Sequence, residues 1–115
     1  MEWLVPWYSV ADNLAHAAGL ERELSRELSA GHPLFGLSVR ALGRRQDRDD
    51  VLFAVADGTE RAAVVHLTWT SRAEQWPWPE AVVYASLSAW AAEGMRADHD
   101  EFHDEAPEEE SKPNK

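Results

Sequence analysis

A histidine and an aspartate occupy positions in this 115-residue sequence where two neighbouring strands would bring them together. His66 lies in the middle of the apolar run 62–70, and Asp50 directly precedes the apolar run before it. Antiparallel pairing places His66 beside Asp49, Asp50 or Val51, depending on the length of the turn. Because a carboxylate can orient an imidazole as a general base, His66 and Asp50 are the candidate catalytic residues. The alternative for a histidine inside a strand is a structural hydrogen bond.

A second pair, His99 and His103, has the four-residue spacing that places two imidazoles on one helix face, where they can bind one metal ion. The surrounding segment HDEFH adds carboxylates but differs from the H-E-x-x-H motif, and no third ligand follows from the spacing. We therefore predict an exposed polar helix end and no cofactor, with a metal site as the alternative.

Several classes of enzyme are excluded by missing residues. The chain has no cysteine, which removes disulfides, thiolate metal ligands and cysteine nucleophiles. No Gly-x-Ser-x-Gly motif and no glycine-rich phosphate loop occur, and both lysines lie within the last four residues. The sequence therefore does not predict a nucleophile-elbow hydrolase or a P-loop nucleotide-binding protein.

The compartment follows from the absence of targeting features. The first ten residues, MEWLVPWYSV, lack the basic start and long apolar stretch of a secretory signal. No run reaches the roughly 18–20 apolar residues of a membrane span. We predict a cytoplasmic protein without membrane contact, and the use of arginine and alanine is typical of a high-GC bacterial genome.

The net charge of −10 is distributed unevenly. Residues 1–97 carry thirteen acids and nine arginines, whereas residues 98–115 carry eight acids and two lysines. Such an acidic chain is repelled by nucleic acid and by anionic membranes, so neither is an expected partner. We predict a solvated, disordered tail over 105–115, with contact to a basic partner as the alternative.

The segment 9–30 is predicted to form a helix, with Ser9 or Asp12 as the N-cap. Its charged residues, Glu23 and Glu27 among them, lie off the apolar face. The residues of that apolar face recur at three- and four-residue steps. They are Leu14, Ala17, Leu20, Leu24 and Leu28. A second helix is predicted over 86–96, beginning at Ser86 or Ser88 and able to continue through Phe102.

Alternating and continuous apolar runs predict the strands. Asp57-Gly58 between two of the runs is a typical hairpin turn, because both residues tolerate positive φ angles. The predicted fold is α+β: an N-terminal helix, a three- to four-stranded mainly antiparallel sheet with a central hairpin, and a C-terminal helix, in one domain over 1–104. The strands are predicted at 37–44, 51–56 and 62–70, with a short edge strand at 81–84.

Six tryptophans are present, and three of them lie between residues 69 and 78. Trp69 falls on the apolar face of its predicted strand, so we expect it to face the core. Trp76 and Trp78 each precede a proline, which excludes them from a central strand. Because tryptophan is a frequent interface anchor, Trp76 and Trp78 are the candidate binding residues, and the alternative is that they supply core packing.

The block 49–79 resembles a family of small, uncharacterised bacterial proteins, and the similarity extends over most of residues 1–103. The resemblance implies no activity. It does imply that Asp50, His66, Trp69 and Trp78 share one environment. The pattern that carries it is Gly31-His32-Pro33-Leu34, Asp49–Phe53, Val64–Trp69 and Trp78-Pro79.

These observations favour a small acidic protein-interaction module of immunity or inhibitor type, whose partner is another protein. The missing catalytic motifs and the excess of tryptophan support it. One alternative is a small hydrolase-like enzyme that uses His66 with Asp50, or a metal held by His99 and His103. Another is an acidic mimic of nucleic acid, although more than half of the excess charge lies in residues 98–115. The sequence does not indicate the oligomeric state.

Overall fold

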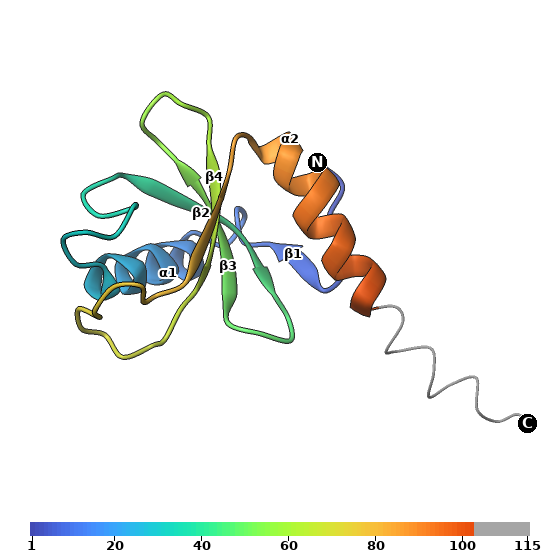
Figure 1. Cartoon of the computed structure of the whole chain (residues 1–115). Helices are drawn as coiled ribbons and strands as arrows, with labels where there is room; N and C mark the ends of the chain where they lie inside the picture. Colours follow the sequence, from blue (N-terminus) through green and yellow to red (C-terminus); the bar gives the residue numbers. More distant parts are fainter. Residues whose placement is uncertain (103–115) are drawn as a thin grey trace, which may run out of the picture.

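Five antiparallel strands lie side by side in chain order in the computed structural model, which describes residues 1–102 (Figure 1). The predicted α+β class is confirmed, with a helix between β1 and β2 and another after β5. The sheet has five strands rather than three or four, because the N-terminal arm pairs with β2 through Trp7 and Arg45. The strands are β1 (Trp7–Ser9), β2 (Val39–Arg45), β3 (Asp50–Val55), β4 (Ala62–His66) and β5 (Ala81–Tyr84).

The first helix, α1 (Leu14–Glu27), is shorter than predicted at both ends. Its N-cap is Asn13, whose side chain accepts the His16 N–H at 3.0 Å, so Ser9 is free to join β1. Leu14 stands in the first turn and is exposed, contrary to its predicted place on the buried face. The helix ends at Glu27 because the next residue, Leu28, is extended.

The second helical segment follows its prediction closely. Ser86 is the N-cap of α2 (Leu87–Trp90) and accepts the Ala89 N–H at 3.0 Å. The helix continues through the π-helical turn η1 (Ala91–Met95) and then through residue 102. None of the helices within residues 1–102 is long and apolar enough to cross a membrane.

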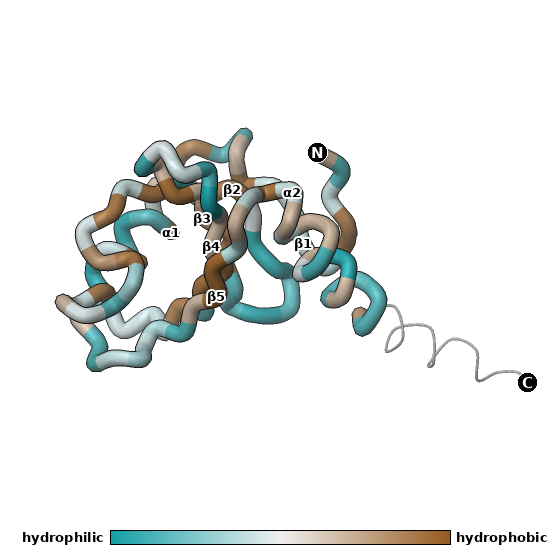
Figure 2. Tube along the Cα trace, turned by 45° about the horizontal axis from the view of Figure 1, so that its top comes forward, coloured by the Kyte–Doolittle hydropathy of each residue, from teal (hydrophilic) through white to brown (hydrophobic). Residues whose placement is uncertain are grey.

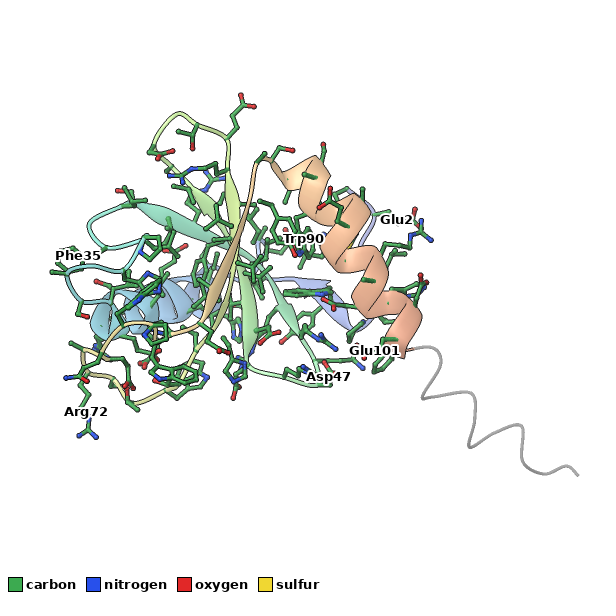
Figure 3. All side chains as sticks on the ribbon, viewed as in Figure 1. Glu2, Phe35, Asp47, Arg72, Trp90 and Glu101 are labelled. Carbon is green, nitrogen blue, oxygen red and sulfur yellow. The ribbon has the colours of Figure 1, made fainter. Side chains whose placement is uncertain are left out.

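The two helical segments cover opposite faces of the sheet (Figure 1). Because side chains alternate along a strand, each strand contributes to both cores, and the strands form a hydrophobic band across the centre of the molecule (Figure 2). The core on the α1 face includes Leu20, Leu24, Val51, Phe53, Val65 and Leu67. The core on the α2 face includes Trp7, Leu52, Ala62, Trp90 and Met95. Trp90 points from its helix toward the sheet (Figure 3).

The long connection from β4 to β5 leaves the sheet earlier than predicted. β4 ends at His66 instead of Thr70, and both Trp69 and Ser71 then adopt positive φ angles of 60° and 59°. Trp69 is 43% exposed, with the Arg44 guanidinium 5.5 Å from its ring centre. The prediction that Trp69 faces the core is therefore wrong, because the extended alternation that supports it stops before this residue.

Candidate functional site

His66 and Asp50 are direct cross-strand partners in the register of β3 and β4. The His66 Nδ1 and Asp50 Oδ1 atoms are 2.6 Å apart, which is a short hydrogen bond. Both side chains fall on the α2 face, since Leu52 and Val64 share their alternation. The structure thus brings together the two residues that were predicted to act as a pair.

The pair lines a cavity of about 460 Å³ that opens on the α2 face of the sheet. Val64 and Val82 are its apolar lining from β4 and β5, and Trp76 with Pro77 comes from the β4–β5 connection. A second cavity of about 340 Å³ shares Asp50, Val64 and Val82 with the first and is lined further by Tyr84 and residues of the C-terminal helix. We call the two adjoining cavities the trough.

The trough is acidic. Among its lining residues are four carboxyl groups and no arginine or lysine: Asp50, Glu80, Glu93 and Asp98. Burial raises the pKa of the Tyr84 phenol, and the carboxylates of Asp98 and Glu93 raise it further. The trough therefore favours a positively charged ligand over a negative one.

One trough carboxylate also joins the C-terminal helix to the sheet. Asp98 Oδ2 accepts the Trp7 indole N–H at 2.9 Å, and Asp98 Oδ1 lies 3.4 Å from the Arg45 guanidinium. Arg45 is buried and also binds Asp47 at 2.9 Å. Asp98 thus has a structural role at one end of the trough, Glu80 lies at the other end, and Asp50 lies where the two cavities adjoin.

His32 is a buried residue that fixes the tryptophan–proline segment to the rest of the fold. Its Nδ1 accepts the Leu34 N–H at 3.1 Å, so its Nε2 carries the proton and donates to the Pro79 carbonyl at 2.8 Å. Its ring meets the Trp76 ring edge-on, with 5.7 Å between the centroids. The sequence predicts a turn at His32 but no role for its side chain, because no local motif indicates a contact with a residue 47 positions away.

The β4–β5 connection is held on α1 by two buried glutamates, which we call the carboxylate clamp. Glu27 is fully buried and accepts the backbone N–H groups of Thr68 and Trp69 at 2.9 and 2.8 Å. Glu23 is also buried and accepts the N–H and hydroxyl of Ser71 at 2.9 and 2.8 Å. Both glutamates are buried although they lie off the predicted apolar face, because the connection folds back over this side of α1.

The two clamp carboxyls have opposite pKa shifts. Burial and then the hydrogen bond with Glu23 raise the pKa of Glu27 to about 7, against the opposing effect of the hydrogen bonds from Thr68 and Trp69. Burial alone would also raise the pKa of Glu23, but hydrogen bonds from Glu27 and Ser71 leave it below its ordinary value. Near neutral pH the pair therefore shares a proton that Glu27 carries and Glu23 accepts.

The other candidate residues fall outside the trough lining. Trp78 is exposed and is not among the residues that line the trough. His99 Nδ1 donates to the Val5 carbonyl at 2.7 Å, and His103 lies outside the described residues. Within residues 1–102 no three side chains of the metal-ligating types are placed to hold a metal ion.

No family model, no curated protein and no solved structure matches this chain. The feature of the molecule that bears on function is the trough, an open, acidic, partly apolar hollow that contains an imidazole–carboxylate pair and has an exposed tryptophan beside it.

Proposed function

We propose that this protein is an interaction module that binds an extended segment of another protein along the trough and the adjoining edge strand β5. Binding of immunity or inhibitor type, in which the module blocks its partner, fits a chain that offers a docking surface. Trp76 and Trp78 are the expected anchors of that surface.

The observation that carries the proposal is the exposure of large apolar side chains in one region. Trp76 and Trp78 are 60% and 45% exposed, and Val82, which lines the trough from the neighbouring strand, is 55% exposed. Isolated exposed apolar residues are ordinary, but a contiguous group bordered by charged groups is typical of a binding surface. Tryptophan supplies such a surface with a large contact area and few rotatable bonds.

The edge of the sheet supports the same conclusion. β5 is the last strand of the sheet order, and no strand in the described part of the chain pairs with its outer side. Its four residues carry no charge that would discourage pairing. An extended peptide can add to such an edge through backbone hydrogen bonds, with alternate side chains entering the neighbouring trough.

Affinity capture from a lysate of the source organism tests the proposal when it compares matched variants. The Trp76→Ala/Trp78→Ala double variant removes the proposed anchors. Phe35→Ala removes an equally exposed aromatic residue that lies on the side of the molecule away from the C-terminal helix (Figure 3). A protein retained by the wild type and by Phe35→Ala but lost by the double variant supports the proposal. Equal retention by all three, or none by any, contradicts it.

The His66–Asp50 hydrogen bond favours one second candidate, a hydrolytic activity in which His66 acts as a general base. Asp50 holds Nδ1 at 2.6 Å, which leaves Nε2 to take a proton from water, because no serine, threonine or cysteine lines the cavity. Assays with chromogenic carboxylic and phosphate esters test it. Turnover that is lost in His66→Gln but kept in His99→Gln would support it, and turnover unchanged in His66→Gln would exclude it.

A further inference from the structure

We propose that the trough binds the guanidinium group of an arginine side chain on the docked segment. This inference rests on the proposed function and specifies the chemistry of the partner. It follows from the shape of the first cavity, from the aromatic ring at its side and from the unbalanced charge of its lining.

The cavity has the parts that an arginine side chain needs. Its volume of about 460 Å³ is ample for one long side chain. Val64 and Val82 offer an apolar surface for the methylene stem, which gains by leaving water while its charged end stays polar. The exposed ring of Trp76 offers a face on which a planar guanidinium can stack.

The charge of the lining selects a cation. Asp50 Oδ1 is bound to His66, and its second oxygen has no hydrogen-bond partner among residues 1–102. Glu80 is exposed and, within the same range, forms no ion pair. A guanidinium presents five N–H donors in one plane, so it can pair with Glu80 while it stacks on Trp76, whereas a lysine ammonium cannot stack in the same way.

Several carboxylates outside the trough have an arginine partner in this chain, whereas Glu80 in the trough has none within residues 1–102. Three aspartates outside it each contact an arginine of their own chain, at 2.9–3.4 Å. Glu80 has no such arginine, and none lines its cavity, whereas the charge of Arg45 acts on Asp50 and Arg45 forms an ion pair with Asp98. The arginine partners of those three aspartates are Arg44 for Asp49, Arg45 for Asp47 and Arg61 for Asp57.

The length of the trough matches a short extended segment. It runs along β5 from Glu80 to Tyr84. Four extended residues span about 13 Å, and every second side chain points the same way. A segment that pairs with the edge of β5 can therefore direct one arginine between Trp76 and Glu80 while its backbone contacts the strand.

Chemical-shift mapping of the full chain with two peptides tests the inference. One probe is an acetylated and amidated tetrapeptide, Val-Arg-Val-Thr, and the other replaces its arginine with citrulline, which keeps the shape and removes the charge. We expect the arginine peptide to shift the signals of the Trp76 indole, His66 and Val82. Loss of the cation–π and carboxylate contacts predicts about tenfold weaker binding for the citrulline peptide. Arginine amide alone should bind more weakly still, because it lacks the backbone contacts with β5.

A pair of variants assigns the effect to the trough. Glu80→Gln removes one proposed carboxylate from an exposed site without an ion pair, so the fold is retained, and it should weaken the arginine peptide about threefold. Glu60→Gln, in the exposed β3–β4 turn outside the trough, should change nothing.

The outcomes separate the two proposals. Equal trough binding of the two peptides, or an arginine peptide indifferent to Glu80→Gln, would overturn the arginine site and leave the docking surface standing. Shifts confined to other surfaces, or no shifts, would also overturn it. The docking surface is tested separately by affinity capture. Retention of a partner that does not depend on Trp76 and Trp78 would overturn it.

Discussion

Replacing Glu27 by glutamine tests the carboxylate clamp with a change of one atom. The two Glu27 oxygens accept backbone N–H groups from Thr68 and Trp69, at 2.9 and 2.8 Å. A glutamine amide has one oxygen and one NH₂ group, so only one of these donors keeps its acceptor. The other N–H then faces a second donor inside a fully buried site.

The expected loss of stability follows from the one N–H group that is left without an acceptor. One buried N–H without an acceptor costs about 1–3 kcal/mol of unfolding free energy. For a domain of this size each kcal/mol lowers the melting temperature by about 4–8 °C, so Glu27→Gln should melt roughly 5–20 °C below the wild type. The β4–β5 connection, which includes Trp69, should be the first part to loosen.

The size of this loss should depend on pH. The pKa of Glu27 is raised from 4.5 to about 7 in the folded protein. Its protonation therefore stabilises the fold fully below pH 4.5, and this contribution is lost as pH rises through about 7. The full shift corresponds to about 3 kcal/mol, and the lowered pKa of Glu23 acts in the opposite direction. Because glutamine does not titrate, the stability gap between wild type and variant should be larger at pH 5.5 than at pH 8.

Urea unfolding followed by circular dichroism at pH 5.5 and pH 8 measures both effects. Glu60→Gln is the matched control, since it removes an exposed carboxyl and should stay within about 0.5 kcal/mol of the wild type. Equal unfolding midpoints for Glu27→Gln and the wild type at pH 5.5 would refute the clamp. A gap that widens toward pH 8 would refute the proton shared with Glu23.

Two further substitutions probe the α2 face. Gly43→Ala would place a Cβ 2.4 Å from the Trp3 ring, so we expect a loss of about 1–3 kcal/mol in thermal unfolding, and an unchanged melting temperature would show that the N-terminal arm is not packed there. Asp98→Asn removes the ion pair with Arg45 while the amide oxygen can still accept the Trp7 indole N–H. It should cost about 1 kcal/mol in urea unfolding, and an unshifted Trp7 indole signal in NMR spectra would contradict this contact.

Much of the fold was predictable because it depends on local patterns. The short apolar run in β5, the hairpin signal at Asp57-Gly58 and the cap at Ser86 each act within a few residues, and the structure contains all three features. The partnership of His66 with Asp50 was also predictable within one residue, because antiparallel pairing leaves few registers once the turn is placed.

The remaining features depend on contacts between distant segments. Glu27 carries the pattern of a solvent-exposed helix residue, and only the return of the β4–β5 connection buries it. Trp69 carries the pattern of a core residue, and the same connection exposes it. His32 has no pattern of its own, and its role comes from a carbonyl 47 residues away.

The sequence by itself therefore determined the α+β class and the central hairpin, and it placed the cross-strand partner of His66 to within one residue of Asp50. These properties follow from side-chain periodicity and from turns, which act over short stretches of chain. Only the tertiary structure decided that Asp50, Glu80 and Trp76 line one acidic trough, and that two helix glutamates are buried beneath a loop. Burial and electrostatic environment depend on which distant segments come into contact, and local periodicity does not specify those contacts.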